Sequence, residues 1–239
     1  MITDFEPVMA ALFAHLQRAV ALPFLADALE GSAVLANVTG FDCLFEGLPV
    51  FGPGVPRGAT IVSLDPDMSQ LTLSAALTAT VEAGGFTTGF QTTGRRVRHW
   101  GDVKAQPALF LRRTGVTDQA MGHYVISTLE CEAWIYCTAG QDPDVAPDTG
   151  LGILEQLVRQ SFAPDGDYGD PRFTLNGAAY WCRIEGRTDT SPGDQGGQAI
   201  ARIPIRVTLT GAEMFDPDGV TGGGDLVFTN PDNSAFSDH

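Results

Sequence analysis

The stretch from Gln106 to Gly211 constrains the fold most, because it reads as two strands, one helix and two further strands. Its five segments are QPALFLRRTG, STLECEAWIYCTAG, GILEQLVRQSFAPD, AAYWCRIEGRT and QAIARIPIRVTLTG. Each strand segment alternates or is rich in β-branched residues, and each is bounded by Gly, Pro, Asp or Thr. We expect one antiparallel sheet covered by the helix. No group of residues in it is arranged for catalysis, so function must come from its surfaces.

Two amphipathic helices are predicted to flank this sheet. The first runs from about Asp4 to Leu22, with capping-box spacing at its start, His15 toward its rim, and an apolar face of Phe5, Val8, Met9, Leu12, Phe13 and Leu16. The second begins near residue 148 and ends at about Phe162, before Pro164. The expected fold class is α+β, a mostly antiparallel sheet flanked by two helices. A short strand is also predicted at Phe173–Leu175.

The segment from Gly31 to Gly94 has a different character and is predicted to be an inserted small all-β domain. It holds ten glycines and short strand-like pieces separated by turn signals. Its glycine-rich GPGVPRG turn lacks the Lys and the helix start of a phosphate-binding loop. The expected organisation is a discontinuous core domain of residues 1–30 and 95–211, the insert at 31–94, and an acidic flexible tail at 212–239.

Two strands carry information about what covers the sheet. In LECEAWIYC, Cys131 and Ile135 share one face while Trp134 and Tyr136 share the other, so both faces carry large apolar groups. A second subunit could cover the outer face, and so could another part of the same chain. In ARIPIRV, Pro204 cannot donate to a ladder, which places this strand at an edge or marks the start of a pairing.

The distribution of charge points to self-association. The net charge of −15 argues against a protein that binds nucleic acid tightly through its phosphates. Six of the fourteen Lys and Arg residues nevertheless fall between Arg95 and Arg113. This basic band is either a solvated loop and strand edge, or a patch that meets an acidic surface of a neighbouring copy in head-to-tail association. With nearby aromatic residues, the candidate inter-subunit contacts are Arg95, Arg96, Arg98, Trp100, Lys104, Arg112, Arg113, Trp134 and Tyr136.

Nothing in the sequence supports a catalytic, cofactor or metal site, and we expect none. Cys43, Cys131, Cys137 and Cys182 lack metal-type spacing, and three of them fall within predicted strands. The Asp-rich loop at 165–170 lacks the Gly and Glu positions of a calcium-binding loop. His99 and His123 have no nucleophile motif nearby. No apolar run is long enough to cross a bilayer and no signal peptide is evident, so we expect folding in the cytoplasm and no membrane partner.

The order of these elements resembles the tail terminator proteins of long-tailed bacteriophages. The resemblance covers Met1 to about Glu30 and Val97 to Gly211, and rests on QPALFLRR, the E-x-E-A-W-I-Y strand, GILEQLVRQSFAPD, FTLNGAAYWCRIEG and QAIARIPIRVTL. The insert is similar to a small β module of phage structural proteins, through its G-x-G-V-P-x-G turn. Ala59 stands ahead of Thr60 there, a minor departure from that pattern, and the minimal terminator has no such insert.

The resemblance implies a hexameric ring that caps the tail tube, ends its polymerisation and joins the tail to the head–tail connector. The implied partners are further copies of the chain, the tail tube protein and a connector or stopper protein, with DNA passing through the lumen without specific binding. The implied location is the tail or neck of the virion, after assembly in the host cytoplasm. A tube, baseplate or decoration subunit is the main alternative, and an enzyme is a third class. The acidic tail is expected to order only against a partner, either the next subunit or the adjoining tail or connector ring.

Overall fold

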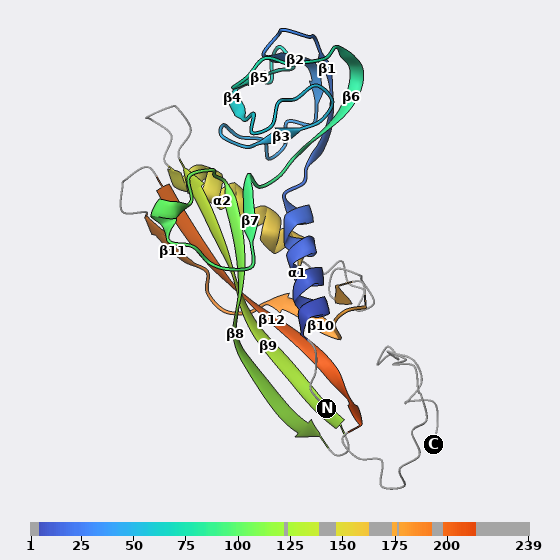
Figure 1. Cartoon of the computed structure of the whole chain (residues 1–239), viewed down its shortest axis with the longest axis vertical. Helices are drawn as coiled ribbons and strands as arrows, with labels where there is room; N and C mark the ends of the chain where they lie inside the picture. The colour runs from blue at the N-terminus through green and yellow to red at the C-terminus, as the bar shows by residue number, and fades with distance from the viewer. Residues whose placement is uncertain are drawn as a thin grey trace.

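A computed structural model describes residues 5–121, 124–138, 147–162, 174–175, 177–192 and 198–213 of the chain. The fold is α+β, with two helices and two mostly antiparallel sheets, as the sequence predicts (Figure 1). The strands of the first sheet all come from the N-terminal part of the chain. The second sheet contains the strands predicted from QPALFLRRTG, STLECEAWIYCTAG, AAYWCRIEGRT and QAIARIPIRVTLTG.

The second sheet has the strand order β10-β12-β9-β8-β7, with β11 also paired to β12. Its neighbours are antiparallel except β7 and β8, which are parallel. The strands are β7 (Thr92–Gly94), β8 (Ala108–Met121), β9 (Tyr124–Thr138), β10 (Trp181–Ile184), β11 (Asp189–Pro192) and β12 (Gln198–Glu213). No strand forms at Thr174 and Leu175, contrary to the sequence-based expectation, and Phe173 lies outside the described residues.

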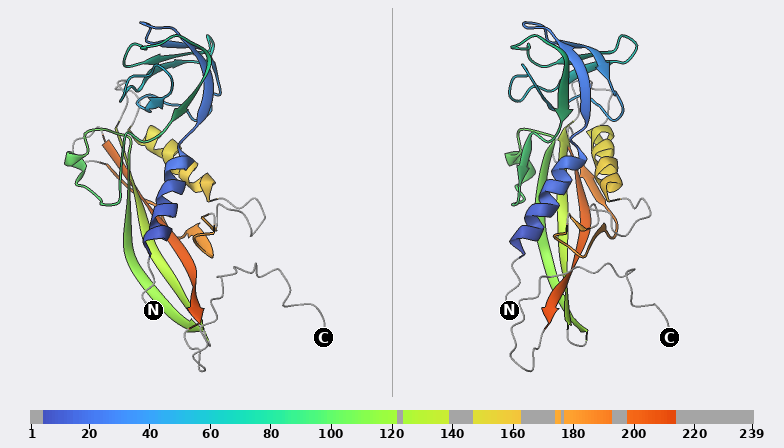
Figure 2. Two further views of the ribbon diagram at one scale, coloured as in Figure 1. Left: turned by 45° about the vertical axis from the view of Figure 1, so that its right-hand side comes forward. Right: turned by 90° about the vertical axis from the view of Figure 1, so that its right-hand side faces the viewer.

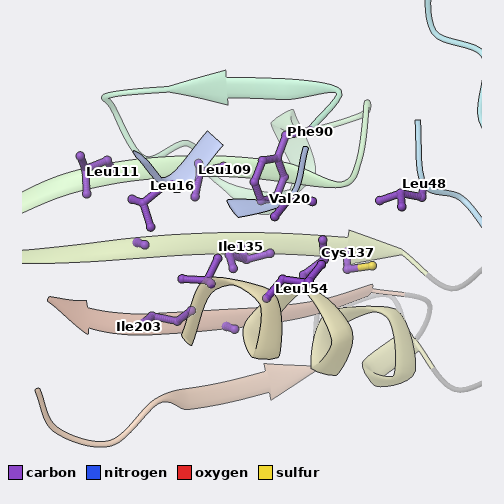
Figure 3. Close-up of a cluster of buried hydrophobic side chains, with 14 of the residues drawn as sticks. Leu16, Val20, Leu48, Phe90, Leu109, Leu111, Ile135, Cys137, Leu154 and Ile203 are labelled. Atoms are coloured by element: carbon purple, nitrogen blue, oxygen red, sulfur yellow. The ribbon is translucent and has the colours of Figure 1, made fainter. Parts of the chain in front are cut away.

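Helices α1 (Glu6–Ala19) and α2 (Pro147–Ser161) pack on one face of this sheet, which we call the inner face. Leu16, Leu154 and three strand residues, Leu109, Ile135 and Ile203, belong to one buried cluster (Figure 3). His15 is buried between the helices rather than placed at an exposed rim, because its Nε2 lies 3.1 Å from both the carbonyl oxygen and the Oγ of Ser161. The helices therefore reach each other through polar as well as apolar contacts.

The first sheet has the order β3-β6-β1-β2-β5-β4 and is antiparallel throughout. Its strands are β1 (Pro23–Ala28), β2 (Val34–Thr39), β3 (Val50–Phe51), β4 (Ile61–Asp65), β5 (Gln70–Leu73) and β6 (Val81–Thr88). The sheet begins ahead of Gly31, because PFLADA alternates and buries Phe24, Ala26 and Ala28. It ends before Gly94, since β7 pairs with β8 of the second sheet. The expected limits of the insert thus do not coincide with those of the sheet.

The chain enters and leaves the first sheet at adjacent points. The Thr88 hydroxyl donates a hydrogen bond of 2.7 Å to the Val20 carbonyl. At the same junction the Leu22 amide donates to the Thr88 hydroxyl, and the Thr88 amide donates to the Leu22 carbonyl. The two sheets also share apolar contacts. A Cβ atom at Gly150 in α2 would lie only 2.8 Å from the Phe45 ring, so glycine allows this loop of the first sheet to approach the helix closely.

Pro204 lies in the middle of the second sheet, so the prediction of an edge strand is wrong. β12 pairs with β9 along one side, while β11 and β10 pair with successive parts of its other side. Glu185 N donates to the Pro204 carbonyl, which shows that Pro204 turns its backbone polar groups toward this second side. The missing N–H falls in the gap between the two short strands. Pro204 instead lies just before the residues of β12 that pair with β10, so the second alternative, that Pro204 marks the start of a pairing, is the one that the structure has.

Candidate subunit-contact surface

The face of the second sheet that is turned away from the helices, the outer face, carries most of the candidate residues. Side chains alternate along each strand, so registered pairs such as Phe110 with Trp134, Trp134 with Arg202, and Arg183 with Arg206 lie on one face. The right-hand view of Figure 2 places α2 on one side of this sheet and the loop after β7 on the other. The outer face therefore has two parts, one under this loop and one beyond it.

The loop that follows β7 covers the first part. Val103 from this loop is buried with Phe110, Tyr136, Ala108 and Ile200, and the partly buried Val97, Trp100 and Trp134 pack against them. The Tyr136 hydroxyl donates a 2.8 Å hydrogen bond to the Arg98 carbonyl, and its ring meets Phe110 edge-on. Tyr136 is only 2% exposed. The chain itself covers this strand on both faces at Tyr136, so this candidate residue offers no exposed ring to a neighbour.

Beyond the loop lies a surface that we call the Arg–Trp face, which consists of Arg112, Trp134, Trp181, Arg183, Arg202 and Arg206. The Arg202 guanidinium lies 4.3 Å from the centre of the Trp134 ring, and that of Arg112 lies 5.7 Å from it. Glu132 holds this group together, because its carboxylate accepts from Trp134 Nε1 at 3.0 Å and pairs with Arg112 at 3.2 Å. Trp134 is therefore fixed between two cations with part of its ring exposed.

The other half of the Arg–Trp face repeats this arrangement. Arg183 lies 4.5 Å from the centre of the Trp181 ring, which is 37% exposed, and pairs with Glu185 at 2.6 Å. Arg206 also pairs with Glu185 at 2.6 Å. Tryptophan and arginine are the residues that most often dominate the energy of protein interfaces. The rings and guanidinium groups on this face are thus held in place by contacts within the chain.

The basic band does not form one patch. Arg112 points to the outer face, whereas Arg113 on the next position of β8 packs over the ring of Phe5 at the start of α1. Arg95 likewise turns toward α1, where it pairs with Glu6 at 2.7 Å. Three more candidates, Arg96, Arg98 and Lys104, have exposed side chains that form no ion pair among the described residues. The band is therefore split between two faces of the sheet.

Four members of the Arg–Trp face were not among the predicted contact residues: Trp181, Arg183, Arg202 and Arg206. The alternation of ARIPIRV does place Arg202 and Arg206 on one face. Their position beside Trp134 and Glu130 depends on the register between β12 and β9, which alternation alone does not fix.

The second sheet also extends beyond its helices as a narrow ribbon of β8, β9 and β12 (Figure 1). From Arg112 to Ala120 nearly every residue of β8 is exposed, and Val116 is 39% exposed. β7 pairs only with Ala108–Phe110, so the remaining edge of β8 has no partner strand within the described chain. A long open edge of this kind readily accepts a strand of another molecule.

The strand cysteines are unsuited to nucleophilic chemistry. Burial raises the pKa of the Cys131 thiol to about 11 and that of Cys137 to about 12, and it raises the pKa of Cys182 further still. A thiol reacts as its thiolate, so these groups are held in the unreactive form at neutral pH. The described residues contain no group of His, Cys, Asp and Glu side chains that could hold a metal ion.

These burials predict a simple labelling pattern. In the native protein a thiol reagent such as Ellman's reagent is expected to modify Cys43, which is exposed, and to leave the other three thiols unmodified. All four should react in denaturant. A Cys43→Ser variant is the control, and it should show almost no fast reaction. Fast labelling of a second thiol in native protein would contradict the described packing of β9 and β10.

Within the described parts of the chain, neither helix has the length and apolar character that a membrane span requires. The chain matches no protein-family model and no curated protein.

Proposed function

We propose that this protein is a structural subunit of a bacteriophage virion, which forms a ring on the end of the tail tube, stops tube polymerisation and joins the tail to the head–tail connector. The observation that carries the proposal is the ribbon of β8, β9 and β12, which projects past the helices and in which β8 is exposed nearly throughout from Arg112 to Ala120 and has an open edge. The assignment to a tail terminator comes from the sequence resemblance, with which the α+β architecture is compatible.

The β8 part of this ribbon gains little stability from burial within one chain, because nearly all of its side chains from Arg112 to Ala120 are exposed. Isolated strands gain stability mainly from burying a face, and here the exposed positions include Val116 in β8. Neighbouring copies in a ring would cover these faces and pair with the open edge. A protein that functions by assembly, and not through a catalytic group, would need a sheet that extends beyond its own helices in this way.

The charges favour head-to-tail contact. Each copy carries a formal charge of −15, so copies repel one another unless local cations meet carboxylates across the contact. Arg96, Arg98 and Lys104 are exposed and form no ion pair within the described chain, so they are free to do this. A contact between two different surfaces is heterologous, and repetition of such a contact around an axis closes a ring. The acidic residues that do not take part in these contacts would let DNA pass through the lumen without binding.

The test is the mass and shape of the purified protein. Light scattering is expected to give a closed oligomer, for which the resemblance implies six copies, and electron microscopy is expected to show rings. Changing Arg96, Arg98 and Lys104 together to Glu should dissociate the oligomer to monomers at moderate salt, because attraction becomes repulsion.

The matched control changes Arg18, Arg57 and Arg187 to Glu, which alters the net charge equally at exposed positions outside the basic band. This variant should keep the mass of the wild type. A basic-band variant that also keeps its mass would refute assembly through these cations, and a wild type that remains monomeric at high concentration would refute the ring.

Another tail protein, such as a tube, baseplate or decoration subunit, is the alternative. It is favoured by the first sheet, where Leu25, Phe51 and Met68 are exposed by 50%, 42% and 63% and could form a contact module. Long tubes in the microscope, rather than closed rings, would identify a tube subunit.

A further inference from the structure

We propose that the acidic C-terminal segment, residues 214–239, binds the Arg–Trp face of its own chain. The sequence leaves the partner of this segment open, whereas the structure offers a preformed surface at which the required chemistry is present. The inference does not depend on ring formation, because segment and surface belong to one molecule. Its basis is charge complementarity, the exposed tryptophan rings, and the length of chain that follows β12.

Charge is the first argument. Residues 214–239 contain five Asp and no Lys or Arg. The Arg–Trp face contains four Arg, and its adjacent carboxylates are Glu130, Glu132, Glu185 and Asp189, which lies opposite Arg202 in the register of β11 with β12. Arg202 forms no ion pair with any described residue. In a chain of net charge −15, this is a surface where cations match the carboxylates in number, and Arg202 has no ion pair, so an acidic segment is repelled less there than elsewhere and can pair with Arg202.

Apolar contact is the second argument. The segment contains Asp225-Leu226-Val227-Phe228, in which one carboxylate precedes three apolar side chains. Trp134 and Trp181 each expose part of a flat ring beside an arginine. A carboxylate can pair with such an arginine while the following side chains cover the neighbouring ring, which supplies the apolar burial that a purely ionic surface contact lacks.

The position of the segment is the third argument. β12 pairs Arg202 with Trp134 and leaves the sheet at Glu213, eleven residues further on. At ~3.3 Å per residue this strand path is about 36 Å long, and the residues from 214 to Asp225 can span about 40 Å when extended. The sequence Asp216-Pro217-Asp218-Gly219 is a turn signal just after the strand, so the chain can reverse toward the Arg–Trp face. Attachment to the same chain gives a high effective concentration.

The experiment is hydrogen exchange followed by mass spectrometry on the full-length protein. At low salt the amides of residues 225–229 are expected to exchange at least tenfold more slowly than those of a free peptide of residues 214–239. Arg202→Glu should remove most of this protection, and so should high salt. Arg57→Glu is the matched control, because Arg57 is exposed and lies between β3 and β4, outside the Arg–Trp face.

A second variant keeps the test valid if Arg202→Glu disturbs the sheet. Leu226→Ser with Phe228→Ser changes only residues outside the described fold, keeps the charge of the segment, and should abolish the protection. The pair Arg202→Asp and Asp225→Arg should restore it. Exchange at the free-peptide rate in wild type, or equal protection in wild type and Arg202→Glu, would overturn the proposal. Protection that rises with protein concentration would place the segment on a second copy and overturn binding within one chain.

Discussion

Replacing Phe110 by alanine is expected to lower the free energy of unfolding by about 3–5 kcal/mol. The ring is fully buried on the outer face, where it meets Tyr136 edge-on with centroids 5.5 Å apart. It also lies against Gly94 of β7, where a Cβ would come within 3.1 Å of the ring. Its removal leaves a cavity between β8 and the loop that covers Tyr136, and that loop has few other apolar anchors.

Urea unfolding followed by tryptophan fluorescence measures this effect directly. Trp100, Trp134 and Trp181 all belong to the second sheet or to the loop that covers it, so the signal reports on this part of the fold. Phe51→Ala is the matched control, because the same side chain is removed from β3 at a position that is 42% exposed. This control is expected to change stability by less than about 1 kcal/mol. Equal losses in the two variants would contradict the described packing of the outer face.

Local pattern predicts most of the second sheet. The segments that alternate became β8, β9, β10 and β12, and the apolar repeat at 148–162 became α2, because each has enough apolar residues on one face to decide its own structure. Residues 23–28 fall within the expected core domain of residues 1–30 and 95–211, whereas in the structure they form β1 of the first sheet. Its alternation in PFLADA is clear, but it follows a helix closely and its partners come from later in the sequence.

The candidate surface depends on information that single segments do not contain. The stacking of Trp134 on Arg202 follows from the register of β9 with β12, and the burial of Tyr136 follows from the path of the loop after β7. The division of the basic band arises in the same way, since Arg112 and Arg113 are neighbours in sequence but point to opposite faces of β8. Charge clustering in sequence therefore shows where cations are concentrated, and only the register of the strands shows which of them act together.

Deleting the first sheet along its own boundaries is expected to leave a folded protein, whereas deleting residues 31–94 is not. The first deletion removes residues 23–88 and joins Leu22 to Gly89 by a short Gly-Ser link. The link has little distance to span, because the amide of Thr88 donates to the Leu22 carbonyl at 3.1 Å. The second deletion leaves β1 without its partners β2 and β6, and it also removes β7 from the edge of the second sheet.

The two deletions are close in length, so they serve as controls for each other. The variant lacking 23–88 should be monodisperse in light scattering and should unfold cooperatively by tryptophan fluorescence, with reduced stability because Phe45 no longer covers α2 near Gly150. The variant lacking 31–94 should aggregate, since an unpaired β1 exposes Phe24 and an open strand edge. If both variants aggregate, the contacts between the sheets are essential for folding. If both fold, β1 does not require the partners that the structure gives it.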